Sequence, residues 1–165
     1  MQWQNDSSMA KEDELSNRII GAAIEVHREL GAGLLESAYE ISLARELELR
    51  GIPFERQVPQ PVIYKDVKLE CGYRMDIVVN DAVVIEIKSV NAIEDIHEAQ
   101  CLTYLRFSGK RLCLLLNFNT PLMKDGIKRI ILGAAARPAK RHNLLSWFFL
   151  AYLCVSLAYL CVTNF

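Results

Sequence analysis

The chain has 165 residues, enough for one domain with a sizeable core and too few for two ordinary domains. Its formal net charge of −1 excludes a general attraction to nucleic acid or anionic membranes, so phosphate binding would need a local basic patch or a bound metal ion. The 5 cysteines form no CxxC pair, the 3 histidines lie far apart, and residues 1–15 contain no apolar signal segment. We therefore expect a cytoplasmic protein with reduced thiols and no zinc site.

The first third of the chain is predicted to be helical. Residues 1–11 are expected to form a disordered lead-in. Over residues 12–30 apolar side chains recur at helical spacing, and Gly31 ends this first helix. A second helix is predicted over about 34–50, because Gly51 follows at the position where glycine commonly ends a helix.

The pattern then changes to the two-residue period of strands. The further elements predicted are strands at 54–58, 62–64, 67–71, 73–79 and 83–88, a helix at 93–108, a strand at 112–117, and a strand or helix at 127–132. The uninterrupted apolar run 112–117 indicates a strand buried on both faces. Together these elements predict one α/β layered domain over residues 12–132.

Two charged side chains stand in the otherwise apolar strand at 83–88. Alternate residues of a strand point to opposite faces, so Glu86 and Lys88 share one face. Burying them is costly unless something binds them, and Asp76 lies in the equally apolar preceding strand. Two carboxylates can hold a hard cation such as Mg²⁺ or Mn²⁺, while a lysine orients a water molecule or offsets developing charge. The alternative is an ordinary ion pair on a solvated sheet face.

The turn between these two strands decides whether the carboxylates can meet. Asp76 and Glu86 lie opposite one another only if Val79 pairs with Val83, which leaves the three loop residues 80–82. The turn dipeptide alone favours a two-residue loop, which would send the carboxylates to opposite faces. We predict the three-residue loop, or a bulge that restores its parity.

These residues carry a family resemblance. Asp76 followed by Glu86-Ile87-Lys88 resembles the core motif of the PD-(D/E)XK nuclease superfamily, although Met75 replaces the proline of the superfamily name. Residues 33–39, GLLESAY, are similar to the GxxExxY signature of one small family within it. Further stretches agree with that family in order and spacing, at 72–76, 97–100, 102–105, 117–119 and 124–129. Over residues 12–132 the resemblance implies a restriction-endonuclease-like fold, a mixed β-sheet flanked by α-helices, with a nuclease-type site.

The resemblance also implies roles outside the core motif. Glu36 would be a further acidic residue brought to the metal, although a carboxylate in a first helical turn is favourable in any protein. Tyr39 of the signature could equally be a core aromatic. Gln100 and Tyr104, four residues apart, would brace the site or contact the substrate, or form only a polar helix edge. Five basic residues could either contact phosphate groups of a substrate or be solvated surface charges without a role. They are Arg45, Arg74, Lys124, Lys128 and Arg129.

We therefore predict Mg²⁺-dependent hydrolysis of phosphodiester bonds in nucleic acid, with DNA favoured over RNA as the partner. Asp76, Glu86 and Glu36 are the predicted metal ligands and, with Lys88, the predicted catalytic residues. One alternative is a catalytically silent nucleic-acid-binding or interaction module that keeps the fold, against which the intact acidic pair argues. A second is a membrane-tethered partner-binding protein. A homodimer is also left open.

A hydrophobic segment follows the domain. No Lys, Arg, Asp or Glu occurs from residue 144 onward, and the apolar stretch 144–162 comes after the basic linker 133–143. As a helix this stretch would extend roughly 28 Å, close to the thickness of the hydrocarbon core of a bilayer. Basic residues before it would keep the domain in the cytoplasm. A membrane anchor is predicted; a helix packed on the domain or on a second copy, or an extension without function, are the alternatives.

Overall fold

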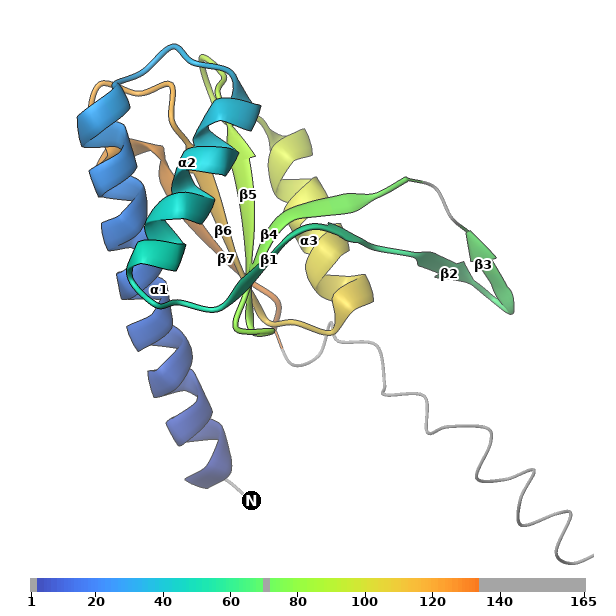
Figure 1. Ribbon diagram of the computed structural model, residues 1–165. Coiled ribbons are helices and arrows are strands. Elements are labelled where there is room, and N and C mark those ends of the chain that lie inside the picture. Colours follow the sequence, from blue (N-terminus) through green and yellow to red (C-terminus); the bar gives the residue numbers. More distant parts are fainter. Residues whose placement is uncertain (1–2, 70–71, 134–165) are drawn as a thin grey trace, which may run out of the picture.

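A computed structural model describes residues 3–69 and 72–133, with side chains from residue 10 onward (Figure 1). Its elements are α1 (Trp3–Leu30), α2 (Glu36–Leu49), β1 (Phe54–Pro59), β2 (Val62–Tyr64), β3 (Val67–Leu69), β4 (Arg74–Val79), β5 (Val83–Lys88), α3 (Asp95–Ser108), β6 (Leu112–Asn117), the 3-10 turn η1 (Met123–Gly126) and β7 (Ile127–Ile131). The predicted helices and strands from residue 12 onward are present with small shifts of their ends. The segment predicted as either strand or helix is the strand β7.

The first helix begins earlier than expected. Because α1 starts at Trp3, the prediction of a disordered lead-in over 1–11 is wrong for the residues from 3 onward. The segment 9–12 consists of Met, Ala, Lys and Glu, which are strong helix formers, and neither Gly nor Pro separates it from the amphipathic part of the helix. Once a helix has nucleated, each added residue costs little, so α1 extends toward the N-terminus.

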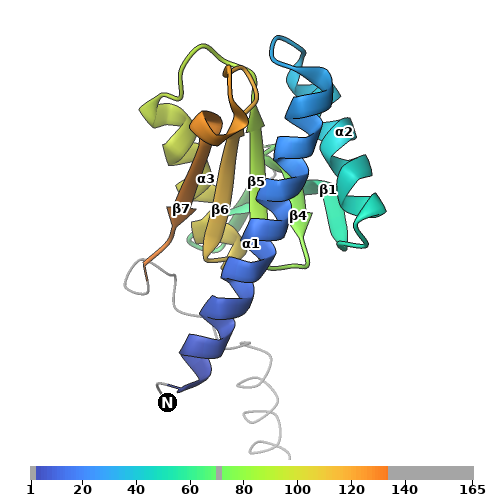
Figure 2. The same cartoon turned by 90° about the vertical axis from the view of Figure 1, so that its left-hand side faces the viewer.

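Five strands form a mixed sheet in the order β1-β4-β5-β6-β7. β5 and β6 are parallel and the other neighbouring strands are antiparallel. A parallel pair needs a long crossover, which α3 provides. α1 and α2 cover one face of the sheet, and α3 covers the other (Figures 1 and 2). The predicted α/β fold, a mixed sheet flanked by helices, is confirmed.

The central strands β5 and β6 are buried on both faces. Ile85 packs in the cluster formed with α1 and α2, whereas its neighbour Val84 packs in the cluster under α3. The pleat of the strand produces this alternation, because successive side chains point to opposite faces. A charged residue in the middle of β5 is therefore enclosed by protein on either face.

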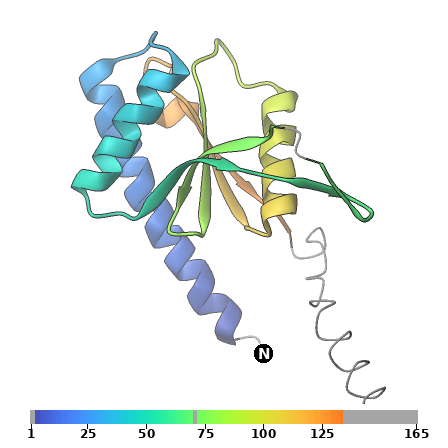
Figure 3. The same cartoon turned by 45° about the vertical axis from the view of Figure 1, so that its right-hand side comes forward.

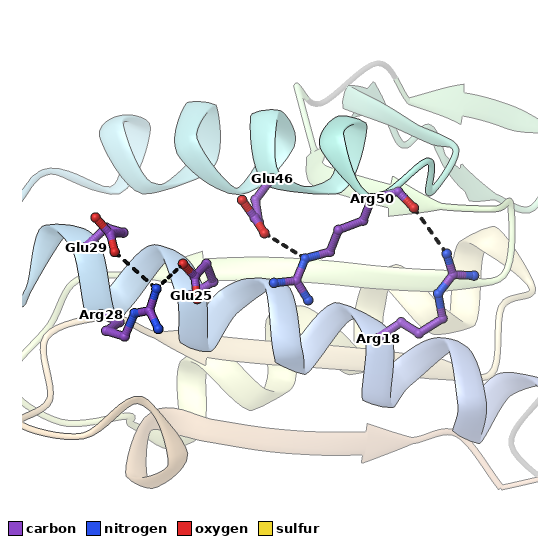
Figure 4. Close-up of polar contacts among 6 residues, drawn as sticks. All are labelled: Arg18, Glu25, Arg28, Glu29, Glu46 and Arg50. Atoms are coloured by element: carbon purple, nitrogen blue, oxygen red, sulfur yellow. Dashed lines mark hydrogen bonds and ion pairs between the residues drawn. The ribbon is translucent and has the colours of Figure 1, made fainter.

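α1 and α2 lie side by side, and Arg50 spans part of their contact (Figure 4). A Cβ at Gly21 of α1 would lie 3.1 Å from Nη1 of Arg50, so the glycine makes room for this side chain. Arg50 donates a hydrogen bond of 2.7 Å to Glu46, and its backbone carbonyl accepts one of 3.4 Å from Arg18. The contact from Arg18 connects α1 to the end of α2.

The turn between β4 and β5 has the predicted odd length. Val79 pairs with Val83, which leaves residues 80–82 in the loop, two of them with positive φ. The pairing continues to Ile77 and Ile85, one residue short of Asp76 and Glu86. The predicted register is therefore confirmed.

β1 and β4 continue beyond the body of the sheet and lead to a separate two-stranded sheet of β2 and β3 (Figure 3). This hairpin, residues 62–69, extends away from the body and is called the arm below (Figures 1 and 3).

In the described part of the chain, no helix has the length and apolarity needed to cross a membrane. The predicted tail 144–162, and the predicted linker from residue 134 onward, lie outside the described residues.

Candidate active site

Asp76, Glu86 and Lys88 come together where β4 and β5 separate. The backbone pairing of these strands ends at Ile77 and Ile85. Beyond that point, Oδ2 of Asp76 accepts a hydrogen bond of 2.8 Å from the backbone N–H of Ile87. A side chain thus takes the place of a strand carbonyl, and this brings the carboxylate of Asp76 against the Glu-Ile-Lys segment.

Glu86 is the most deeply enclosed charged residue of this group. Its side chain is 2% exposed, and Oε1 accepts a hydrogen bond of 2.7 Å from Nζ of Lys88, whose side chain is 13% exposed. Oε2 of Glu86 is buried and has no hydrogen-bond partner among the described residues. A buried carboxylate oxygen without a partner is costly. The predicted alternative of a solvated surface ion pair does not fit these exposures.

The burial of this group shifts its protonation equilibria. Desolvation, followed by repulsion from Asp76, raises the pKa of Glu86 to about 7, although Lys88 opposes the shift. Desolvation also raises the pKa of Asp76, against the opposing hydrogen bond from Ile87. Burial by itself lowers the pKa of Lys88, but its ion pair with Glu86 outweighs this and the pKa is raised. The two carboxylates therefore repel one another in a poorly solvated place.

These properties fit a divalent cation held by two carboxylates. A positive ion between Asp76 and Glu86 would offset their repulsion and provide a partner for Oε2 of Glu86. Within residues 3–69 and 72–133, no group of three or more His, Cys, Asp or Glu side chains is close enough to hold a metal ion. Mg²⁺ commonly uses only one or two protein carboxylates and keeps several water ligands, so a pair of carboxylates is compatible with such an ion.

Comparison with known families agrees with this geometry. The model of a family described as the PD-(D/E)XK nuclease superfamily matches residues 13–130, more than two thirds of the chain. The chain belongs to the PD-(D/E)XK nuclease superfamily. No curated protein and no solved structure matches it. The matched residues thus include all or part of every element from α1 to β7.

Glu36, a further predicted ligand in this superfamily domain, is the first residue of α2. Its Oε1 accepts a hydrogen bond of 3.1 Å from the backbone N–H of Ser89, directly after Lys88, and the Ser89 hydroxyl donates one of 2.6 Å to the carbonyl of Leu34. The start of α2 is thereby fastened to the end of β5. Glu36 adds to the negative potential that raises the pKa of Asp76 and of Glu86.

Tyr39 holds the loop before α2 in place. Its ring is fully buried and stacks on Phe118 with a centroid distance of 4.4 Å. Its hydroxyl donates a hydrogen bond of 2.7 Å to the carbonyl of Gly31 and accepts one of 3.1 Å from the N–H of Leu34. Tyr39 is therefore a core aromatic, one of the two roles that the sequence left open, and it shapes the loop that presents Glu36.

Gln100 and Tyr104 connect α3 to the strand that carries Asp76. Gln100 donates a hydrogen bond of 2.8 Å to the hydroxyl of Tyr104, which donates one of 2.9 Å to the backbone carbonyl of Arg74. Desolvation raises the pKa of Tyr104 to about 12, so this hydroxyl keeps its proton. The chain of hydrogen bonds holds β4 two residues before Asp76.

Most of the basic residues considered for phosphate binding are engaged in ion pairs. Lys128 pairs with Glu98, Arg129 with Asp13, and Arg45 with Glu48. Arg74 is exposed and lies two residues before Asp76 on the same strand. Of this set, Arg74 is thus the residue nearest in sequence to the site.

Two buried polar residues near the site were missed in the sequence. Glu40 is 8% exposed and accepts hydrogen bonds from Arg56, at 2.9 Å, and from Gln57, at 2.7 Å; its charge also raises the pKa of Asp76. Its position four residues after Glu36, on the same helix face, is the signal that could have indicated it.

Asn117 is the other residue; it lies in the family-like stretch 117–119, but no role was predicted for it. It pairs with Lys88 across β5 and β6, and its side chain is buried. Its amide accepts a hydrogen bond of 3.1 Å from the N–H of Val90 and donates one of 2.8 Å to the carbonyl of Val90. Asn117 therefore fixes the loop that follows Lys88. A single amide at the end of an apolar strand was the available signal.

Proposed function

We propose that this superfamily member is a divalent-metal-dependent nuclease that hydrolyses phosphodiester bonds in nucleic acid. The observation that carries the proposal is the buried oxygen Oε2 of Glu86, which lacks a partner while Asp76 repels its carboxylate. A chain with no use for a cation would gain stability by replacing such an acid with an apolar residue.

Asp76 and Glu86 would hold Mg²⁺ or Mn²⁺, with Glu36 as a further acidic residue at the edge of the site. When bound, the metal polarises a phosphoryl oxygen and lowers the pKa of a water molecule. Lys88 would orient the attacking water and offset the charge that develops on the phosphate. Its ammonium group is already directed along this face of β5 by its hydrogen bond to Glu86.

The surrounding residues would keep this arrangement rigid. Tyr104, supported by Gln100, holds the backbone of β4, and Ser89 connects the end of β5 to Glu36. Catalytic groups act well only when their positions are held by a supporting layer of hydrogen bonds. These residues are proposed as positioning residues and not as groups that react.

We further propose that the chain belongs to the GxxExxY family within the superfamily. Each signature residue has a local function that supports this. Gly33 has φ of 97°, which favours glycine; Glu36 begins α2 and bonds to Ser89; and Tyr39 closes the loop.

A second candidate function is a nucleic-acid-binding module without catalysis. The observation that favours it is the hydrogen bond between Glu36 and Ser89, which engages an oxygen of the third predicted ligand. The two candidates differ in one measurable property, which is cleavage.

Cleavage by the full-length chain decides between them. We would incubate the protein with single- and double-stranded DNA and RNA in the presence of Mg²⁺, Mn²⁺ or EDTA. The matched control for Glu86→Gln is Glu48→Gln, which neutralises an exposed acid of α2. Metal-dependent cleavage that Glu86→Gln abolishes and Glu48→Gln preserves supports the nuclease. Binding without cleavage under every condition supports the silent module, and equal cleavage by Glu86→Gln rejects the assigned site.

A further inference from the structure

A pocket of about 270 Å³ lies between the candidate active site and the arm. It is lined by Pro59, Gln60, Pro61, Lys68, Gly72, Tyr73 and Arg74. The lining combines an aromatic ring, two prolines, an amide and two cationic side chains, and it includes no acidic residue among those described. This local composition differs from the chain as a whole, whose net charge is −1.

We propose that this pocket binds an unpaired nucleotide next to the scissile phosphate, and that the substrate is therefore single-stranded nucleic acid. The proposal rests on the nuclease function proposed above and adds the class of strand. Tyr73 is 44% exposed and offers a ring on which a base can stack. Stacking on a protein ring requires a base whose faces are accessible, which a duplex does not provide.

The position of the pocket connects it to the site. Arg74 lines the pocket and stands two residues before Asp76 on β4. Residues two apart on a strand are about 7 Å apart, which is close to the spacing of successive phosphates along an extended nucleic-acid strand. A guanidinium at this distance is suited to hold a phosphate that neighbours the one at Asp76 and Glu86.

Tyr73 and Arg74, which line the pocket, are held in place by contacts with Tyr104 of α3 and with Gln60. The ring of Tyr73 meets the ring of Tyr104 edge to face, with a centroid distance of 6.4 Å and an angle of 82°. The Tyr104 hydroxyl bonds the backbone carbonyl of Arg74, and the N–H of Gln60 donates a hydrogen bond of 2.8 Å to the carbonyl of Tyr73. The backbone carbonyls of Tyr73 and Arg74 are thus each held by one hydrogen bond. A rigid platform lowers the entropic cost of binding.

The arm carries the same kinds of side chain as the pocket, an aromatic ring and a cation. At its tip the ring of Tyr64 is exposed, and Nζ of Lys65 lies 5.4 Å from its centroid. The arm extends away from the body of the protein (Figure 3), and its residue Lys68 lines the pocket, so a strand that leaves the pocket away from Asp76 would pass along the arm. Aromatic rings interleaved with cationic side chains are the usual surface for single strands.

The test measures binding without cleavage. Fluorescence anisotropy of a labelled oligothymidylate, and of a duplex of the same length, is followed with the full-length chain in EDTA. The variants are Tyr73→Ala and Arg74→Ala, with Tyr73→Phe and Arg74→Lys to keep the ring or the charge. The matched control is Arg45→Ala, which removes an exposed positive charge from α2.

We expect the wild type to bind the single strand at least about fivefold more tightly than the duplex. Tyr73→Ala and Arg74→Ala should each weaken single-strand binding about fivefold or more, while Tyr73→Phe, Arg74→Lys and Arg45→Ala change it less than twofold. Equal affinity for single strand and duplex, or unchanged binding by Tyr73→Ala, would overturn the inference.

A direct readout in the wild type avoids any effect of the substitutions on folding. A single-stranded oligonucleotide that carries 5-iodouracil should crosslink on irradiation to Tyr73, identified by mass spectrometry of the peptides. Crosslinks confined to other residues overturn the proposal. Crosslinking and selective binding without metal-dependent cleavage would support the nucleotide pocket and reject the nuclease function. Metal-dependent cleavage whose KM does not change in Tyr73→Ala would support the nuclease function and reject the pocket.

Discussion

The carboxylate of Asp76 bonds the backbone N–H of Ile87, the residue between Glu86 and Lys88, at 2.8 Å. One side chain thus serves both as a backbone acceptor, where the strand ladder ends, and as a member of the acidic pair. Asp76 therefore has a structural and a proposed catalytic task, and different substitutions separate them.

Asp76→Asn and Asp76→Ala are expected to differ in stability but not in activity. Asn keeps an oxygen that can accept the Ile87 hydrogen bond, whereas Ala leaves that amide without its acceptor and should cost roughly 1–3 kcal/mol of unfolding free energy. Both remove a carboxylate, so metal-dependent cleavage should be lost in both. Chemical denaturation and the cleavage assay measure the two effects. Full cleavage by Asp76→Asn would contradict the assignment of Asp76 as a metal ligand.

The stability of the metal-free protein should fall as the pH rises from about 5 to about 8. Glu86 has a pKa of about 7 in the folded protein against an ordinary 4.5, so between these values the folded state holds the proton more tightly than the unfolded chain does. Above the folded-state pKa, the ionised carboxylate of Glu86 lowers the free energy of unfolding by up to about 3 kcal/mol. Denaturation in EDTA across this pH range measures the slope, which should be smaller in Glu86→Gln. An identical slope in that variant would contradict the raised pKa.

Mg²⁺ should reverse this loss of stability. Because a ligand carboxylate must be deprotonated, Mg²⁺ is expected to raise the melting temperature of the wild type near pH 8 and to have little effect near pH 5. Glu86→Gln should show no gain at either pH, while the control Glu48→Gln should respond as the wild type does. A gain in Glu86→Gln equal to that of the wild type would place the ion elsewhere.

Gly126→Ala is expected to destabilise the fold. A Cβ at this position would lie 2.0 Å from the backbone carbonyl oxygen of Asn117, a contact that forces η1 and the end of β6 apart. We expect a loss of about 1–3 kcal/mol, with a parallel loss of cleavage because Asn117 holds the loop after Lys88. Gly133→Ala is the control, since no atom of the described residues lies within 4 Å of its Cβ position, and it should change the unfolding free energy by less than about 0.5 kcal/mol. Comparable melting temperatures for the two variants would show that η1 can move at little cost.

Deletion of residues 144–165 should leave the melting temperature unchanged. In the described part of the chain the buried residues run from Ser16 to Leu132, and the helices α1, α2 and α3 already cover both faces of the sheet. The truncated chain should also be more soluble, because the apolar stretch 144–162 is removed. A large drop in melting temperature, measured by circular dichroism, would instead show that this segment packs against the domain.

The pattern of residues was enough to predict the helices and strands and the odd length of the loop between β4 and β5. The alternation in 83–88 placed Glu86 and Lys88 on one face, and the requirement that Asp76 join them predicted the three-residue loop that the register confirms. Such predictions succeed because strand period and hairpin pairing are local rules of backbone geometry.

The polar residues that surround the site could be identified only after the chain had folded. Glu40, Gln57 and Asn117 look like ordinary polar residues in the sequence, yet two of them are buried and all three bond within the folded core. Gln57 also has φ of 52° where β1 passes Asp76, which no local pattern of residues indicated. Burial depends on which helix covers which face, and hydrogen-bond partners come from segments distant in the chain. The cost of an unpaired buried oxygen, such as Oε2 of Glu86, therefore arises only once the helices have closed over the sheet.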